Sequence, residues 1–511
     1  MPQDGEYTDR SSFPGGSLMS FPSAQGDGTV ALPRGPLFGI RLSLPRPRGV
    51  VMRPIYGSIA LWGLVAACLA VVVVASAVPT NLVQTSDIIF PGWMAGPLHG
   101  VFAGPLHALI GKAGFSANFS YAYSALFLLM LVAYAVVLAS ARTLSMRAIT
   151  IAIVATYAFI LLSPQLELSD LFNYIGYARL GALHGLNPYT HVIGNEAYDP
   201  VSLFATWHHW SSPYGPLFTL LTYPLGGLPI SSAYWLMKVL MVGFSAGFVA
   251  LVWQCARQLG HDPRFAVLFV AVNPIVLIYE IGGFHNDPVM LVPMMAAISL
   301  LLAKRYRWAG VALAAAIAVK FTAALLLPFL LIAAWRRRKS LQLLIGVALG
   351  GIPLVLASVA AFGFALPNAA DQTTIVTPLS VVNLVGVIFH LGGATPALEA
   401  VSKAVVVLVT GALAFASWRH DRPDWLSGAG WATIALLLCM SWLMPWYVIW
   451  VLPLAALSTS PRLRRATLAF TAFSALTFLP VTGTILADLH VSTMRTHADH
   501  TAQVRLAKLM R

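Results

Sequence analysis

Charged side chains are scarce in this chain. Only 10% of its 511 residues are Asp, Glu, Lys or Arg, whereas a soluble domain has about 25%. The mean hydropathy is +0.77. The apolar residues form long runs, such as residues 55–78, that can cross about 30 Å of hydrocarbon as a helix. These features exclude an ordinary soluble protein and lack the alternating pattern of a β-barrel, so we expect an all-α polytopic membrane protein.

Cysteine is also rare. The three cysteines, Cys68, Cys255 and Cys439, lie far apart within apolar runs. They therefore indicate small buried side chains rather than a disulfide framework or a metal site. His208 and His209 have no third ligand at metal spacing, so we expect no metal. The chain has no G-x-G-x-x-G candidate in a soluble βαβ unit, and we expect no cofactor.

Acidic residues are outnumbered by basic ones, 18 to 31, which gives a net charge of +13. The basic residues form short clusters between apolar runs, at 142–147, 257–264, 304–307, 336–339 and 462–465. This is the positive-inside pattern of cytoplasmic loops. Because no basic face with aromatic readers accompanies the charge, we expect no nucleic-acid partner.

The composition divides the chain into three parts. Residues 1–50 are rich in Gly, Pro and Ser and are predicted to be a disordered cytoplasmic tail. Residues 51–488 are predicted to be the membrane domain and residues 489–511 a C-terminal tail. We predict about thirteen crossings, at 55–78, 119–140, 148–165, 232–256, 265–281, 287–303, 308–320, 321–335, 341–363, 398–418, 426–443, 446–459 and 467–486. This count places the basic C-terminal tail outside, so the tail is an interfacial helix or the count is off by one.

Most unusual polar residues fall on the predicted external side. They lie in the acidic loop 166–213, near helix ends and in two turns, and the main ones are Asp170, Arg179, Lys238, His285, Asn286, Asp287, Lys320, Trp446 and Tyr447. Such a gathering favours an extracytoplasmic active site. Simpler readings remain open: Asp170 as a helix N-cap, the 285–287 segment as turn and cap residues, the lysines snorkelling to the interface, and the aromatics as an interfacial belt.

Five motifs occur in a characteristic order. They are "SDLFNYIGYARLGALHGLNPYTH" (169–191), "WSSPYGPLFTLL" (210–221), "NPIVLIYEIGGFHNDPVML" (273–291), "AIAVKFTAALLLPF" (316–329) and "MPWYVIWVLP" (444–453). Together the motifs resemble those of bacterial polyprenyl-phosphate-mannose-dependent α-1,6-mannosyltransferases of the GT-C superfamily, over about residues 55–486. The resemblance implies a multi-span enzyme of the bacterial cytoplasmic membrane whose extracytoplasmic loops form the active site.

The resemblance also implies a chemistry and a set of site residues. Such enzymes move a sugar from a polyprenyl-phosphate carrier to a glycan or glycolipid acceptor, with inversion at the anomeric carbon. Asp170 matches the acidic position that acts as general base. Cations suited to the donor phosphate are Arg179, Lys238 and Lys320. Residues suited to the sugars are Asn187, Tyr189, Tyr214, His285, Asn286, Asp287, Trp446 and Tyr447.

Departures from the family pattern leave alternatives open. The chain has Asn187 where the family often has Asp, and Lys238 where it often has Arg. Asp87, in the loop after the first helix, is a rival general base. A transporter or flippase of polyprenyl-linked saccharides would also have many spans and a few intramembrane charges. A non-catalytic subunit of a wall-assembly complex is predicted to lack the acid.

Overall fold

The computed structural model describes residues 54–77, 98, 100–110, 119–166, 170–367, 374–419, 424–491, 493 and 496–510. Every regular element in these ranges is a helix. Residues 51–511 form one compact unit, and the predicted tail at 1–50 lies outside the described residues. The expected all-α class is therefore confirmed for the described part of the chain.

Five described helices are long and apolar enough to cross a membrane: α1 (Pro54–Ala77), α3 (Phe119–Ala139), α7 (Ile230–Gln258), α12 (Ser340–Phe362) and α15 (Pro396–Arg419). A sixth span results if α18 (Pro461–Phe478) and α19 (Pro480–Asp488), which are bent by 63°, count as one. The predicted count of about 13 spans is not confirmed.

Shorter helices account for the difference. The remaining elements that correspond to predicted crossings are α4 (Met146–Leu162), α8 (Pro263–Ala271), α9 (Asp287–Leu302), α10 (Tyr306–Val319), α11 (Leu327–Trp335), α16 (Trp425–Leu438) and α17 (Leu452–Leu457). A helix of about 14 residues is only about 21 Å long, less than the hydrocarbon thickness of about 30 Å. Length alone therefore does not make these segments full spans.

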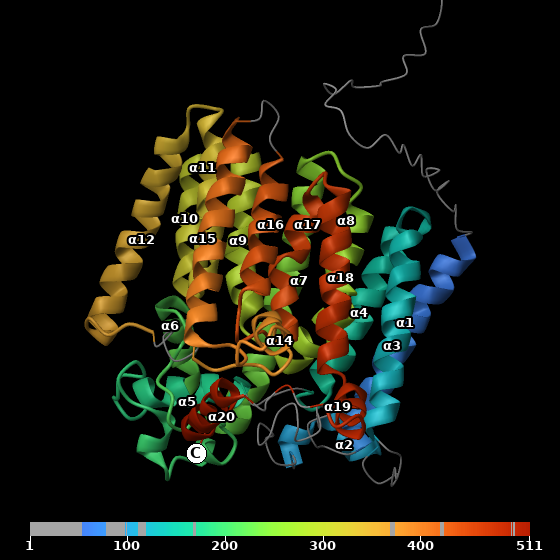
Figure 1. Ribbon diagram of the computed structural model, residues 1–511, viewed down its shortest axis with the longest axis vertical. Coiled ribbons are helices and arrows are strands. Elements are labelled where there is room, and N and C mark those ends of the chain that lie inside the picture. The colour runs from blue at the N-terminus through green and yellow to red at the C-terminus, as the bar shows by residue number, and fades with distance from the viewer. Residues whose placement is uncertain are drawn as a thin grey trace, which may run out of the picture. The chain divides into compact units, whose positions relative to one another are not determined.

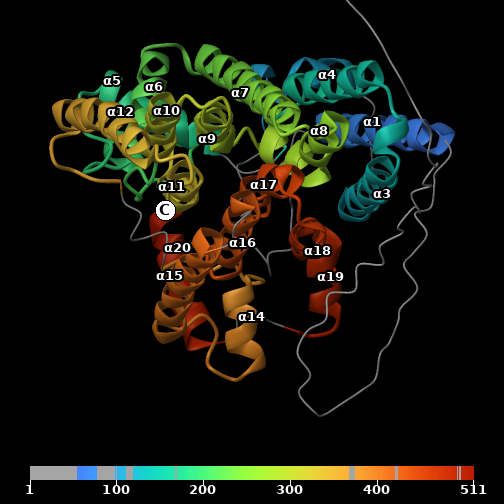
Figure 2. The ribbon, with the colours of Figure 1, turned by 90° about the horizontal axis from the view of Figure 1, so that it is seen from above.

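The long helices run side by side, and the connections at their two ends differ (Figure 1). The turns that join α3 to α4, α7 to α8 and α11 to α12 lie at one end, and they carry the basic clusters at 142–147, 257–264 and 336–339. The opposite end carries helices that are too short or too polar to be spans, among them α5 (Asp170–Ala182), α6 (Pro216–Gly226) and α20 (His497–Met510). Seen from above, α1, α3 and α4 form one group and α10, α11 and α12 another (Figure 2).

Polar caps begin several helices at the basic end. The Ser145 side chain accepts a hydrogen bond from the Ala148 amide at the start of α4, and Asp262 accepts one from the Arg264 amide at the start of α8. These bonds satisfy amide groups that have no partner within the helix. At these two connections a single polar residue fixes the start of the following helix.

Breaks in the apolar runs leave non-helical backbone inside the helical unit. The predicted helix at 265–281 consists of α8 followed by a π-helical turn, η5 (Val276–Ile281), and the predicted helix at 446–459 is the 3₁₀ segment η7 (Pro445–Trp450) plus α17. Lys320 has an extended backbone between α10 and the 3₁₀ segment η6 (Phe321–Leu326). Irregular backbone at membrane depth is tolerated where it is buried in protein or lines a cavity. These breaks meet at the cavity described next.

Candidate active site

A polar and aromatic cavity of about 170 Å³ lies among segments that are far apart in the sequence. They are the start of α5, residues 207–215, the turn before α9, residues 320–322, and residues 440–450. The predicted site residues that line the cavity are Asp170, Tyr214, His285, Asn286, Asp287, Lys320, Trp446 and Tyr447. The rival base Asp87 lies outside the described residues.

Asp170 is the first residue of α5, at the positive end of the helix dipole. Its Oδ1 accepts hydrogen bonds from Asn173 Nδ2 (3.3 Å) and Trp207 Nε1 (3.2 Å). The Asn173 Oδ1 in turn accepts the backbone amides of Thr206 and Trp207. Asn173 therefore ties the 206–207 segment to the helix that carries Asp170, and both are held in one orientation.

His285 approaches the other carboxylate oxygen. Its Nδ1 lies 3.1 Å from Asp170 Oδ2, and its ring stacks on the Trp446 indole with ring centroids 3.7 Å apart. Burial raises the pKa of Asp170. The contacts with His285, Trp207 and Asn173 together lower the pKa by more than burial raises it, so the net pKa lies below its ordinary value. The side chain of Asp170 is 15% exposed. The result is an ionised carboxylate that a ligand in the cavity can reach.

Asp287 and Lys320 form a second charged pair in the cavity wall. Lys320 Nζ lies 2.6 Å from Asp287 Oδ1, which also accepts a hydrogen bond from Trp450 Nε1. The ammonium group lies 5.3 Å from the Tyr447 ring centroid and 5.2 Å from that of Trp450. Its side chain is 20% exposed, so a fixed cation with an aromatic surround is accessible from the cavity.

The turn before α9 presents polar atoms that have no protein partner. Phe284 is buried and has a φ of 55°, an unusual conformation for a bulky residue, which turns the chain at His285. The Asn286 amide donates to the Tyr174 hydroxyl. Among the described residues, His285 Nε2, Asn286 Nδ2 and Asp287 Oδ2 are buried without a hydrogen-bond partner. Groups of this kind call for an explanation, and a ligand with several hydroxyls would satisfy them.

Four predicted site residues do not line this cavity. Lys238 is buried, donates to the Ser163 carbonyl (2.6 Å) and lies 4.1 Å from the Trp235 ring centroid and 4.7 Å from that of Phe284. It therefore contacts the residue that precedes His285 rather than the cavity itself.

Asn187 and Tyr189 lie behind the cavity wall. Asn187 donates to the Phe362 carbonyl and accepts the Tyr189 amide. The Tyr189 hydroxyl donates to the Tyr214 carbonyl (2.9 Å). Both residues thus support the segment that carries Tyr214 and do not face the cavity.

The Arg179 guanidinium is held by protein groups. Its Nε donates to both carboxylate oxygens of Asp199 (2.9 and 2.8 Å), and its Nη1 donates to the carbonyls of Gly226 and Leu228. His184 Nε2 lies 2.7 Å from Asp199 Oδ2. Burial raises the pKa of Asp199, but His184, the Val201 amide and Arg179 lower it by more, and the net pKa lies below its ordinary value.

We therefore expect Arg179→Gln to act on stability. The pair is largely buried, with side chains 12% and 2% exposed, and removing one member of a buried pair lowers the free energy of unfolding by about 3 kcal/mol. Thermal unfolding in detergent would show a lower midpoint. Because the pKa of Asp199 is depressed, this contribution is present at neutral pH and is lost as the pH falls through that pKa. A normal midpoint with a raised KM for the donor would instead make Arg179 a ligand.

Several residues of the site were not singled out from the sequence. Trp207 and Trp210 belong to "TWHHW", a stretch that draws attention to its histidines as metal ligands. Among the described residues, no group of three His, Cys, Asp or Glu side chains could hold a metal. Glu280, on η5, is buried, and neither carboxyl oxygen has a hydrogen-bond partner in the described part of the chain. An acidic residue inside the apolar run "NPIVLIYEIGGF" is the feature by which Glu280 could have been found from the sequence.

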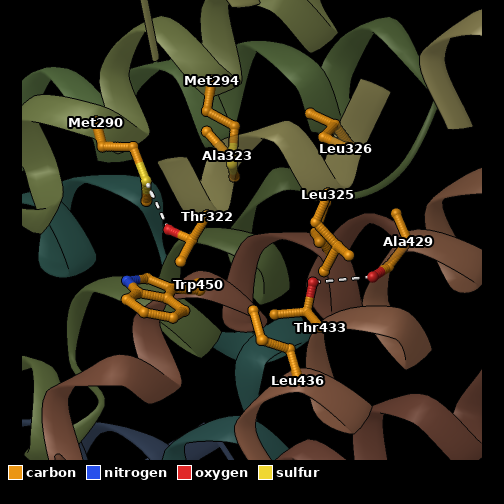
Figure 3. A pocket seen from close by; sticks show the side chains of 11 residues that line it. Met290, Met294, Thr322, Ala323, Leu325, Leu326, Ala429, Thr433, Leu436 and Trp450 are labelled. Carbon is orange, nitrogen blue, oxygen red and sulfur yellow. Dashed lines mark hydrogen bonds between the residues drawn. The ribbon is translucent and has the colours of Figure 1, made fainter. Parts of the chain in front are cut away.

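An apolar cavity, drawn in Figure 3, shares part of its wall with the polar one. Side chains of α9, η6 and α16 line it, including Met290, Leu325 and Leu436. Thr322 and Trp450 line both cavities. The Thr322 hydroxyl donates a hydrogen bond to Met290 Sδ (3.6 Å), so its polar group is satisfied within the apolar wall. The apolar cavity has a volume of only about 20 Å³, so an apolar tail would enter it only if the side chains that line it moved apart.

Comparison with known proteins places the chain in a family. The family model described as "Alpha-(1->6)-mannopyranosyltransferase, N-terminal domain" matches residues 60–336, and the model described as "MptB C-terminal domain" matches residues 373–505. The chain belongs to the alpha-(1->6)-mannopyranosyltransferase family. This is a family of glycosyltransferase enzymes, and the resemblance seen in the five motifs is confirmed.

Individual relatives agree with this placement. Alpha-(1->6)-mannopyranosyltransferase A of Mycobacterium tuberculosis is 29% identical over 65% of this chain and 69% of the relative. A probable alpha-(1->6)-mannopyranosyltransferase of Mycolicibacterium smegmatis is 26% identical over 61% of this chain and 65% of its own length. Alpha-(1->6)-mannopyranosyltransferase A of Corynebacterium glutamicum is 30% identical over 31% of this chain and 33% of the relative. No solved structure matches the chain.

Proposed function

We propose that this chain transfers mannose from a polyprenyl-phosphate carrier to a glycan or glycolipid acceptor and forms an α-1,6 link. The observation that carries the proposal is a single cavity with the carboxylate of Asp170, the ammonium of Lys320 and unpartnered polar atoms at residues 285–287. The sugar and the linkage are those in the names of the relatives.

Asp170 is the proposed general base. The acceptor hydroxyl attacks the anomeric carbon, its proton passes to the Asp170 carboxylate, and the bond from the anomeric carbon to the phosphate oxygen breaks with its electrons on the phosphate. One displacement inverts the configuration, so a β-linked mannosyl phosphate gives an α-mannoside. The depressed pKa of Asp170 keeps the carboxylate ionised at neutral pH. The N–H groups of Asn173 and Trp207 hold it in place.

Lys320 is the proposed partner of the leaving phosphate. Negative charge grows on the phosphate as the bond breaks, and a fixed cation in a partly dehydrated cavity stabilises that charge. Asp287 holds the ammonium in place through a 2.6 Å contact. Trp446 and Tyr447 offer aromatic faces to the C–H faces of the sugar, and Asn286 and His285 offer polar atoms to its hydroxyls.

The apolar cavity is the proposed site for the start of the prenyl chain, and because its volume is only about 20 Å³ its side chains must move apart to admit the chain. It joins the polar cavity at Thr322 and Trp450, so a phosphate near Lys320 would place the adjoining isoprene units beside α9 and α16. The hydrophobic effect favours burial of those units, by about 0.8 kcal/mol for each CH₂ group.

The cavity is proposed to open on the extracytoplasmic side. It lies near α5, at the end of the bundle opposite the basic turns. The positive-inside rule assigns basic turns to the cytoplasm, which also places the start of α1 inside.

The test uses membranes that contain the protein and radiolabelled polyprenyl-phosphate mannose. We expect label to appear in a covalent glycan or glycolipid product, with linkage analysis giving α-1,6-mannose. Polyprenyl-phosphate glucose and arabinose serve as matched donors with another sugar and should give far less product. Label that crosses sealed vesicles without forming a covalent product would contradict the proposal and identify a flippase.

A further inference from the structure

A third pocket, separate from the two cavities described above, lies at the end of the bundle that carries the basic turns. It has a volume of about 860 Å³ and is formed by the α11–α12 turn and the C-terminal end of α15. Its walls carry three arginines and two tryptophans: Arg336, Arg338, Arg419, Trp335 and Trp418. From this composition we propose that the pocket binds the head group of an anionic phospholipid. The inference is independent of the proposed function.

The backbone at Arg338 departs from the preference of its residue type. Its φ is 54°, in the left-handed region, at the end of α11. The Arg338 amide donates to the Trp335 carbonyl, and the Lys339 amide donates to that of Ala334, which closes the helix end. Glycine is the usual residue at such a position, because it adopts this conformation without steric strain. An arginine here keeps a guanidinium in the pocket wall despite the backbone preference.

The three arginines of the pocket differ in their contacts with the protein. Arg336 Nη2 donates to the Trp418 carbonyl (2.9 Å) and so links the two sides of the pocket. Arg419 lies 5.5 Å from the Phe415 ring centroid. Within the described ranges, no carboxylate lies at ion-pair distance from Arg338 or Arg419. Guanidinium groups bind phosphate through paired N–H bonds, so a phosphate is the ligand that fits.

The flanks of the pocket indicate a lipid rather than a soluble phosphate. In the apolar stretches of α12 and α15 that are long enough to cross a membrane, only 11% and 6% of the residues are buried inside the protein. Both helices therefore expose apolar sides. Trp335 and Trp418, 61% and 49% exposed, are of the type that lies at the membrane–water interface. Basic pockets between membrane helices are known to bind anionic head groups. The acyl chains would lie along α12 and α15, with the phosphate between the arginines.

The test compares lipid binding by the whole purified chain and by a matched pair of variants. The pocket variant is Arg338→Gly with Arg419→Gln, in which the glycine suits the left-handed backbone. The control is Arg462→Gln with Arg465→Gln, which removes the same charge from α18 at the same end. Native mass spectrometry of delipidated protein would measure binding of phosphatidylglycerol, cardiolipin and phosphatidylcholine.

We expect the wild type and the control to bind the anionic lipids at least tenfold more tightly than phosphatidylcholine. The pocket variant should lose at least tenfold in that affinity and keep its thermal midpoint in lipid-free detergent. Equal binding by the pocket variant, or no preference for anionic lipid, would overturn the proposal. Competition by millimolar inorganic phosphate would also overturn it, because the site would then recognise a soluble anion.

Discussion

Replacement of Asp170 by asparagine is expected to reduce mannosyl transfer by about 10²- to 10⁴-fold. Asparagine has nearly the same shape and its Oδ1 can still accept the Trp207 N–H, so the fold of the site is kept. What it cannot do is take the proton of the acceptor hydroxyl. The measurement is the rate of product formation from radiolabelled polyprenyl-phosphate mannose at equal amounts of membrane protein.

A matched carboxylate serves as the control for Asp170. Glu196 lies in the same acidic segment, 166–213, with a side chain 36% exposed, and it does not line the cavity. Glu196→Gln should keep activity within about twofold, as surface substitutions usually do. Normal activity of Asp170→Asn would exclude this residue as the base. Loss of activity in both variants would point to a general effect of charge on the segment.

The pH dependence of the wild type provides a further measurement on the same carboxylate. The folded-state pKa of Asp170 lies below its ordinary value. The base is therefore ionised at neutral pH, and activity is lost only as the pH falls through that depressed pKa. We expect kcat/KM to show no acid limb between about pH 5 and 7. A loss of kcat/KM inside that pH window that disappears in Asp170→Glu would contradict the environment described for Asp170.

Replacement of Lys320 by methionine is expected to have the other large effect. Loss of a fixed cation beside a developing phosphate charge should lower kcat by about 10²- to 10³-fold, by analogy with the loss of an oxyanion-stabilising donor. The same change leaves Asp287 buried without its partner, which lowers the free energy of unfolding by about 3–5 kcal/mol. Activity and the thermal midpoint are both measured.

A second variant separates the two effects. In Lys320→Met with Asp287→Asn, the buried unpaired charge is gone, so the thermal midpoint should recover while kcat remains low. Lys320→Arg keeps a cation and should retain more activity than either. Recovery of kcat in the double variant would show that Lys320 serves only to neutralise Asp287.

The sequence drew attention to polar residues that line one cavity, because such residues are out of place in an apolar chain. Asp170, His285, Asp287 and Lys320 lie in four distant segments, and the structure brings them to one cavity. Their shared side of the membrane could be inferred from the order of apolar runs. Their mutual contacts could not, because the distances depend on the breaks at η5, η6 and η7.

Partners within the protein were harder to foresee. Arg179 and Lys238 are cations in a predicted external region, and nothing in their local sequence shows that one pairs with Asp199 and the other contacts Trp235 and Phe284. These partners depend on tertiary packing. The predicted number of spans is not confirmed for a related reason. Hydropathy identifies apolar helices, but those of 10–17 residues can be buried against other helices without crossing.

The indole of Trp450 and the side chain of Thr322 belong to both the polar and the apolar cavity. For the proposed donor, this shared wall would contact the junction between the phosphate and the first isoprene unit. The sugar would then be held at the same position relative to Asp170, whatever the length of the remaining chain. The enzyme would then distinguish lipid carriers by the first few carbons of the prenyl chain, and the far end of the chain would not affect binding.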